Sequence, residues 1–176
     1  METEAQLIQA CLQNDRNAQR KLYNAYAGKM LVVCMRYVQN QAEAEDILQE
    51  GFIKVFQNLD KFRADSTLWA WIKRIMINTA INQIRSQQHF QNMDDVQEYE
   101  NQVSDNQSGI EAIHFQELIE MIQKLPKGCQ TVFNLFAVEG YKHQEIAQLL
   151  NITEGTSKSQ YSRAKTILQG ILSVGQ

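Results

Sequence analysis

The stretch EGYKHQEIAQLLNITEGTSKSQYSRAK, residues 139–165, has the pattern of two short helices joined by a tight turn. Ile146 and Leu150 recur at core spacing in its first half. Asn151 follows, and asparagine tolerates the left-handed backbone conformation with which many helices end. Thr153 is placed to cap a second helix, because its hydroxyl can accept a free backbone N–H. The stretch therefore predicts a helix-turn-helix, whose second helix enters a DNA major groove.

The second predicted helix carries side chains that suit nucleic acid. Lys and Arg bind phosphates or guanine edges, and hydroxyl and amide groups can pair with base edges. An ordinary helical hairpin with a solvated polar face would show a similar pattern, so the motif alone leaves both interpretations open. The candidate DNA-contacting residues are Thr156, Lys158, Ser159, Gln160, Ser162, Arg163 and Lys165.

The composition of this 176-residue chain favours an all-α protein of one or two small domains. It contains one proline and eight glycines, and Gln, Ala, Ile and Leu are abundant. No apolar run approaches the roughly 20 residues of a membrane span, and the acidic, amphipathic N-terminus does not match a secretory signal. The three cysteines form no CxxC pair. These features together predict a cytoplasmic protein.

The net charge of −3 is unevenly distributed along the chain. Residues 86–111 carry six acidic and no basic side chains, whereas the parts before and after them have net charges of +2 and +1. The acidic stretch lacks helical periodicity and is rich in Asn, Gln, Asp and Ser, which is typical of a flexible linker. We therefore expect a helical domain over 1–86, an acidic linker over 87–110 and a helical domain over 111–176. Because both domains are only mildly basic, the chain alone should bind DNA weakly.

Four helices are expected in the first domain, and the last of them, about 67–86, has an unusual polar stripe. Apolar residues cover most of its circumference, and steps of three and four residues place the polar ones on a single face. Arginine, asparagine and tryptophan there could contact phosphates, base edges and an unstacked base. A buried helix with one exposed polar strip would give the same pattern, so a partner is not specified. The stripe consists of Trp71, Arg74, Asn78, Asn82 and Arg85.

No motif indicates an enzyme, a metal centre or a cofactor. The chain has no glycine-rich phosphate loop, and no potential nucleophile has an evident base partner. Glu111, His114 and Glu117 have the spacing of helical metal ligands, but no second set of ligands accompanies them. We therefore expect a non-enzymatic protein that requires neither a metal nor a cofactor.

Two blocks of sequence, taken together, resemble a known family. They are DILQEGFIKVFQNLDKFRADSTLWAWIKRIMINTAINQIR (46–85) and LPKGCQTVFNLFAVEGYKHQEIAQLLNITEGTSKSQYSRAK (125–165), separated by the acidic linker. In this order and spacing they resemble bacterial sigma factors of the extracytoplasmic-function (ECF) group of the sigma-70 family. The resemblance implies a region 2-like helical bundle and a region 4-like helix-turn-helix domain. It also implies promoter-specific transcription initiation with core RNA polymerase, and control by an anti-sigma factor that is often tethered to a membrane.

The resemblance also implies roles for individual residues. A loop and the polar stripe match the part of the family that opens and reads the −10 promoter element, and the second helix of the helix-turn-helix matches the reader of the −35 element. The linker resembles the segment that threads through the RNA exit path of the polymerase. The expected −10 loop residues are Phe62, Arg63 and Ser66. The surface expected to dock on the clamp helices of the largest polymerase subunit contains Asp46, Gln49, Glu50, Ile53 and Phe56. The polymerase flap is the second expected contact.

Two departures from the family pattern lie in the second helix of the motif. The family usually has a hydrophobic residue at the position of Ser157 and a basic one at the position of Gln160. The missing cation puts part of the −35 contact set in doubt. Two rival functions remain: a helix-turn-helix regulator that binds an operator as a dimer, and a helical adaptor that binds only protein. The first needs a dimerisation face and a more basic surface, and the second leaves both polar helices unexplained.

Overall fold

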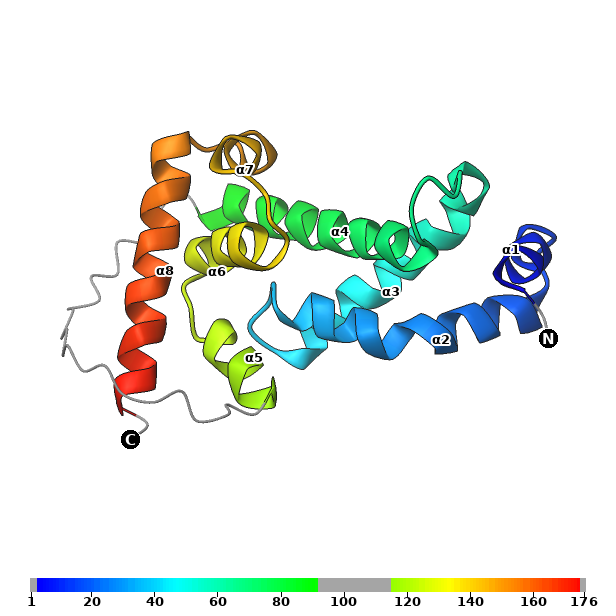
Figure 1. Cartoon of the computed structure of the whole chain (residues 1–176), viewed down its shortest axis with the longest axis horizontal. Helices are drawn as coiled ribbons and strands as arrows, with labels where there is room; N and C mark the ends of the chain where they lie inside the picture. Colours follow the sequence, from blue (N-terminus) through cyan, green and yellow to red (C-terminus); the bar gives the residue numbers. More distant parts are fainter. Residues whose placement is uncertain (1–2, 92–114, 175–176) are drawn as a thin grey trace. The chain divides into compact units, whose positions relative to one another are not determined.

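The computed structural model describes residues 3–91 and 115–174, and within these ranges every regular element is a helix. The predicted all-α fold is therefore confirmed (Figure 1). The elements, in chain order, are α1 (Glu4–Leu12), α2 (Arg16–Met35), α3 (Gln41–Asn58), η1 (Leu59–Lys61), α4 (Leu68–Gln91), α5 (Phe115–Gln123), α6 (Lys127–Phe133), η2 (Asn134–Val138), α7 (His143–Leu150) and α8 (Glu154–Val174).

The contacts divide the chain into two compact units. Unit 1 comprises Met1–Met35 and Asn40–Gln83, and unit 2 comprises Arg36–Gln39 and Ile84–Gln176. Helix α4 continues to Gln91, beyond the end expected at residue 86, and three of the five added residues are glutamines, which form helices readily. Most of the predicted acidic linker, 87–110, lies outside the described residues. The predicted domain boundaries therefore stay a prediction.

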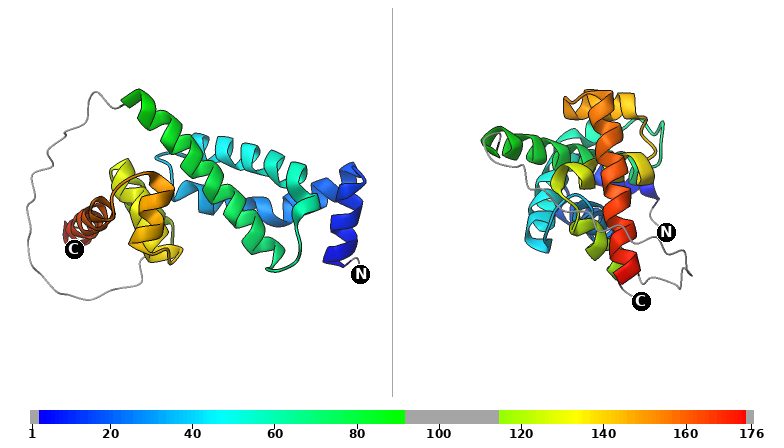
Figure 2. Two further views of the ribbon diagram at one scale, coloured as in Figure 1. Left: turned by 90° about the horizontal axis from the view of Figure 1, so that it is seen from above. Right: turned by 90° about the vertical axis from the view of Figure 1, so that its left-hand side faces the viewer.

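Unit 1 is built on α2 and α3, which lie side by side (Figures 1 and 2). Helix α3 begins after Asn40, whose side-chain oxygen accepts the backbone N–H of Glu43 at 2.9 Å. Its apolar positions recur every three or four residues, so they fall on one face and are buried. The buried residues of α3 are Ala44, Ile47, Leu48, Gly51, Phe52 and Val55.

Helix α4 completes the core of unit 1. Leu68, Ile72 and Met76 are fully buried along the face that packs inward. Met76 reaches Gly51 of α3 so closely that a β-carbon at Gly51 would overlap the methionine sulfur. The small residue on α3 therefore allows the two helices to approach each other, and this approach determines which side of α4 remains exposed.

Unit 2 has an apolar core formed by α5, α6 and α8. Met121, Leu125, Cys129, Ala164 and Leu168 are its buried members. Helix α7 also packs on α8 (Figure 1). Asn151, which ends α7, has φ 55° and ψ 47°, the predicted left-handed conformation. The Thr153 hydroxyl accepts the backbone N–H of Thr156 at 3.0 Å, so the predicted cap of the second helix is also present.

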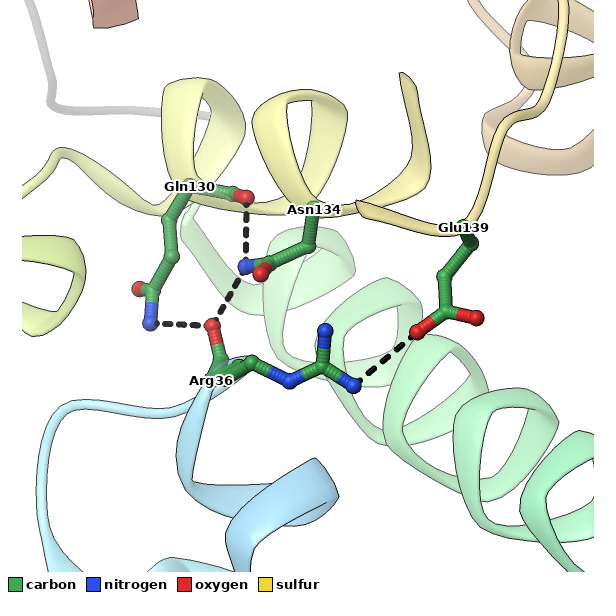
Figure 3. Close-up of polar contacts among 4 residues, drawn as sticks. All are labelled: Arg36, Gln130, Asn134 and Glu139. Atoms are coloured by element: carbon green, nitrogen blue, oxygen red, sulfur yellow. Dashed lines mark hydrogen bonds and ion pairs between the residues drawn. The ribbon is translucent and has the colours of Figure 1, made fainter. Parts of the chain in front are cut away.

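Within unit 2, polar side chains of α6 and η2 bind the backbone of residues 36–39 (Figure 3). The buried side-chain amides of Gln130 and Asn134 both donate to the Arg36 carbonyl, and Gln130 donates also to the Val38 carbonyl at 3.0 Å. The Arg36 guanidinium pairs with Glu139 at 2.9 Å. The carbonyls that follow the end of α2 are thus satisfied by side chains that come much later in the sequence. These hydrogen bonds could not be predicted from the sequence, because buried amides leave no periodic apolar signal.

Candidate nucleic-acid and polymerase interfaces

The polar stripe of α4 is exposed in the structure, as predicted. Arg74, Asn78, Asn82 and Arg85 are exposed, and Trp71 is half-buried. The opposite side of the helix is buried in the core, whereas the stripe is accessible to solvent or a partner. Two cations and two primary amides therefore lie along one accessible helical face. This arrangement supplies donors for phosphates and base edges, and whether these residues contact DNA stays a prediction.

The loop before α4 brings an aromatic residue to the start of this stripe. The rings of Phe62 and Trp71 pack with their centroids 5.5 Å apart at an interplanar angle of 56°. Arg63 and Ser66 are exposed in the same loop. Thr67 ends the loop by capping α4, since its hydroxyl accepts the backbone N–H of Ala70 at 3.2 Å. Phe62 thus brings the predicted loop into contact with the first residue of the stripe.

A pocket of about 330 Å³ opens beside the stripe, entirely within unit 1. Its walls come from α3, η1 and α4, and they combine two ammonium groups, three amides, an indole and aliphatic groups. No carboxylate is among the lining residues, and the Lys54 ammonium pairs with the Glu50 carboxylate, which is not one of them. The lining residues are Lys54, Asn58, Lys61, Trp71, Ile75, Asn78, Thr79 and Asn82.

Five of these residues were missed by sequence analysis. Lys54, Asn58 and Lys61 recur at steps of four and three, so they form a second polar stripe that faces the first across the pocket. This spacing was a usable signal, but only the fold shows that the two stripes line one cavity. Ile75 and Thr79 follow the inward edge of the α4 stripe. The Thr79 hydroxyl donates to the Ile75 carbonyl at 2.8 Å.

The expected polymerase-binding residues lie on α3. Asp46, Gln49 and Glu50 are exposed, Ile53 is 57% exposed, and Phe56 is half-buried. The Glu50 carboxylate pairs with Lys54 at 2.6 Å on the next turn. Because Lys54 also lines the pocket, a change at Glu50 would affect two candidate sites at once. Asp46 and Gln49 are therefore the better positions for testing this surface alone.

The second helix of the motif, α8, presents most of its predicted residues to solvent. Lys158, Ser159, Ser162, Arg163 and Lys165 are exposed. The Lys158 ammonium donates to the Glu154 carboxylate at 2.8 Å, and this hydrogen bond lowers the pKa of the exposed carboxyl. The Lys165 ammonium lies 4.9 Å from the centre of a tyrosine ring on the same helix. These side chains form a mixed basic and hydroxyl surface along α8. The remaining two members of the predicted set, at positions 156 and 160, are half-buried.

Gln160 differs from its neighbours because its side chain points into unit 2. Its Oε1 accepts from the Cys129 thiol at 2.9 Å, and its amide lies against Gly128. Burial raises the pKa of the Cys129 thiol, whereas the charge of Arg163 opposes that rise. The absence of a cation at position 160 thus has a structural reason, since a charged side chain in the same orientation would be placed beside a buried thiol.

The other departure from the family pattern, Ser157, also has a structural explanation. Ser157 is fully buried, and its hydroxyl is 2.9 Å from Nδ1 of His143 on α7. The His143 ring stacks on Phe136, with centroids 4.2 Å apart and planes 12° apart. A hydroxyl–imidazole hydrogen bond therefore joins the two helices where the family usually has an apolar contact. It satisfies the buried hydroxyl that would otherwise destabilise the domain.

Comparison with known proteins assigns both parts of the chain to one family. Residues 22–90 match Sigma-70 region 2, and residues 115–168 match Sigma-70, region 4. The RNA polymerase sigma-H factor of Pseudomonas aeruginosa is 29% identical over 97% of this chain and 94% of its own length. The ECF RNA polymerase sigma-E factor of Haemophilus influenzae is 28% identical over 95% of this chain and 94% of its own length. These matches span nearly the whole of each relative.

A solved structure shares the fold. The sigma factor RpoE of Bartonella quintana, crystallised with the anti-sigma factor NepR, superposes with a TM-score of 0.52 and 22% identity, over 89% of this chain and 98% of that one. The chain belongs to the sigma-70 family of RNA polymerase sigma factors, in its extracytoplasmic-function group. It is a factor for promoter-specific transcription initiation. Among the described residues, no helix combines the length and apolarity needed to cross a membrane.

Proposed function

We propose that the two units divide promoter recognition between them, with unit 1 opening and reading the −10 element and unit 2 reading the −35 element. The observation that carries this proposal is the pocket beside the α4 stripe, which joins two lysines and three amides to an indole and has no carboxylate in its lining. Such a set suits one nucleotide turned out of the duplex. Unstacking a base costs a few kcal/mol, which the pocket contacts would offset.

The exposed face of α3 is proposed to dock on the clamp helices of the largest subunit of core RNA polymerase, with the flap as a second contact for the chain. The support is an exposed aliphatic residue, Ile53, next to exposed acidic and amide groups. An apolar centre with a polar border is common in protein interfaces. Asp46 and Gln49 on this face are exposed, so they can be changed without disturbing the core of unit 1.

The charge reversal Asp46→Lys is expected to weaken binding to core polymerase by at least about tenfold, since it reverses a charge inside the proposed contact. Fluorescence anisotropy of the labelled full chain titrated with core polymerase measures this. Glu45→Lys is the matched control, because it makes the same charge change about 100° further around the helix. Equal affinities for the two variants would exclude this face, and thermal unfolding checks that both remain folded.

Helix α8 is proposed to enter the major groove of the −35 element, with Lys158, Ser159, Ser162 and Arg163 as the contacts. Gln160 is a poorer candidate than the sequence indicated, because its amide is engaged with Cys129 and Gly128. Thr156 and Lys165 lie at the edges of this surface, and Thr156 already donates its backbone N–H to the helix cap.

Arg163→Ala is expected to lower holoenzyme affinity for upstream-element DNA. It should also reduce the slope of log affinity against log salt by about 0.9 if the guanidinium contacts one phosphate. Binding titrations at several salt concentrations measure both quantities. Lys124→Ala removes a cation from an exposed position on unit 2 outside α8, so it should leave the slope unchanged. Identical slopes for the two variants would contradict the assignment.

An anti-sigma factor is the third proposed partner of this chain, after promoter DNA and core polymerase, and the family resemblance implies one tethered to a membrane. The related RpoE of Bartonella quintana was crystallised with an anti-sigma factor, NepR. We also propose that the chain acts by binding alone, without catalysis of its own. Co-purification of the tagged chain from its host, with and without inducing stress, would identify the inhibitor.

Promoter-specific run-off transcription tests the proposed function directly. Core polymerase should transcribe a cognate promoter only when this chain is added, and the chain alone should give no footprint at the concentrations that suffice for the holoenzyme. A sequence-specific footprint by the chain alone, with two-fold symmetry, would favour the dimeric regulator. Binding to polymerase without any promoter preference would favour the protein-binding adaptor.

A further inference from the structure

We propose that the exposed face of α2 is a second DNA-binding surface of unit 1, which holds the sugar–phosphate backbone of promoter DNA just beyond the −10 element. This inference rests on the proposed function of α4 and its preceding loop as the −10 reader. It adds a helix that carries no residue of the predicted sites. Most of the face also precedes residue 22, where the match to Sigma-70 region 2 begins. This α2 stripe consists of Arg16, Asn17, Arg20, Lys21 and Asn24.

The first observation is that charge is segregated among the helices of unit 1. Helix α2 carries four Lys or Arg side chains and no Asp or Glu, whereas α3 carries four acidic side chains and one basic. Helix α4 again has no Asp or Glu, and it carries three Lys or Arg side chains. The acidic helix is the proposed polymerase surface, and α4 is the proposed DNA surface. The charge of α2 therefore matches that of the DNA-reading helix.

The second observation is that the cations of the α2 stripe share one exposed side of the helix. Arg16, Arg20 and Asn24 recur at steps of four residues, and Lys21 lies beside them. All four are exposed. The partly exposed Tyr23 instead packs on a phenylalanine ring of α3, with ring centroids 4.7 Å apart. The stripe thus presents cations and primary amides to a partner, without a large apolar side chain.

The third observation is that nearby carboxylates are engaged elsewhere. Asp15 Oδ1 accepts two backbone N–H groups in the first turn of α2, at 2.8 and 3.3 Å, and so caps this helix. Glu4 of α1 accepts the Tyr26 hydroxyl at 3.2 Å. Among the residues that the structure describes, neither Arg16 nor Arg20 has an ion-pair partner. Both guanidinium groups are therefore available to an external anion.

The α2 stripe lies at the same end of unit 1 as the −10 loop. Helix α1 contacts both α2 and η1, the short helix that leads into this loop (Figures 1 and 2). The stripe occupies the half of α2 that follows α1 directly. Helix α4 starts after the loop and runs on in sequence toward the proposed −35 reader. We therefore expect the loop, and the stripe near it, to face the promoter on the side of the −10 element away from the −35 element.

The composition of the stripe favours a phosphate backbone over a protein surface. Protein interfaces usually have an apolar centre, which this stripe lacks. Arginine, lysine and asparagine side chains donate to phosphate oxygens and position DNA without reading its sequence. Each neutralised phosphate releases counterions and adds about 0.7–0.9 to the slope of log affinity against log salt. The stripe should therefore contribute affinity that depends on salt and not on base sequence.

Salt titrations of promoter binding test the proposal, with holoenzyme that contains the full chain. Arg20→Gln should lower the slope by about 0.7–0.9, because one phosphate contact is lost. Between about 50 and 200 mM salt, wild type should lose about threefold more affinity than this variant. Changing Arg16, Arg20 and Lys21 together to glutamine should lower the slope by about 2–3. Glutamine is a good helix former, so α2 should stay folded, which thermal unfolding checks.

Lys29→Gln is the matched control, since it removes the same charge from an exposed position of the same helix, about 80° beyond Lys21 and outside the stripe. It should leave the slope unchanged. A second control is a promoter fragment that keeps both elements but ends directly after the −10 element. On this fragment wild type and Arg20→Gln should have equal slopes, because the adjoining phosphates are missing.

Equal slopes for Arg20→Gln and Lys29→Gln on the full promoter would overturn the proposal, as would a slope difference that persists on the shortened fragment. Weaker binding of Arg20→Gln to core polymerase, with an unchanged DNA slope, would also overturn it and assign the face to a protein partner. Failure of the proposed function would look different, because Arg74→Gln on α4 would then leave promoter affinity unchanged as well.

Discussion

Replacing Trp71 with alanine is expected to reduce promoter opening by about tenfold or more while leaving closed-complex formation nearly unchanged. Stacking of a base on an aromatic side chain contributes about 1–3 kcal/mol, and Trp71 is the indole that lines the pocket proposed to bind a nucleotide. The change also removes the ring that Phe62 packs against, so the −10 loop loses its aromatic anchor. Permanganate reactivity of unpaired thymines measures opening, and gel shift at low temperature measures the closed complex.

Trp69→Ala is the matched control for this experiment. Trp69 also lies on α4 and is 37% exposed, but it packs against Lys73 on another side of the helix and does not line the pocket. Its removal should leave opening within about twofold of wild type, since it costs only a surface cation–π contact. Equal losses for both variants would mean that the pocket is not where the melted strand binds.

Gly51→Val is expected to destabilise unit 1 by about 1–3 kcal/mol, the usual cost of overpacking a closely packed core. The new side chain would have to displace the buried Met76 thioether. For a domain of this size, each kcal/mol lowers the melting temperature by about 4–8 °C. Calorimetry of the full chain measures the shift. Met76→Ala should destabilise unit 1 less in the Gly51→Val background than on its own, because the valine would occupy the space that the methionine side chain leaves.

Gly28→Ala should act in the opposite direction. Gly28 lies on an exposed face of α2, and nothing lies within 4 Å of where its β-carbon would be. A glycine inside a helix is less favourable than alanine by about 0.5–1 kcal/mol, so this change should raise the melting temperature. A rise for both glycine variants would show that α3 and α4 are not packed as closely as the structure has them.

Much of the architecture could be predicted from local pattern. The left-handed Asn151 and the Thr153 cap follow from the chemistry of these two residues and their immediate neighbours, so they were predicted correctly. The α4 stripe was predicted for a related reason: helical periodicity alone determines which residues share a face. The roles of these residues toward DNA and polymerase stay predictions, since periodicity indicates exposure and not a partner.

Contacts between distant residues could not be predicted in this way. Gln160 was grouped with the DNA-contacting residues because it shares α8 with them, yet the packing of α6 turns its amide toward Cys129. Ser157 looked like a departure from the family until α7 supplied the His143 imidazole as its partner. In both cases the side chain's partner lies on a different helix, and the spacing of residues within α8 carries no information about that helix.

The sequence by itself determined the helical class, the turn of the helix-turn-helix, the exposed stripe of α4 and the family. The helical class, the turn and the stripe depend on local spacing along one helix or turn, where backbone geometry leaves few alternatives. The family follows from the order and spacing of two long blocks of sequence. Only the tertiary structure decided that Lys54, Asn58 and Lys61 face the α4 stripe across one pocket, and that Gln130 and Asn134 hold residues 36–39 within unit 2. Both depend on how closely helices pack, and one small residue such as Gly51 changes that distance without altering any helical pattern.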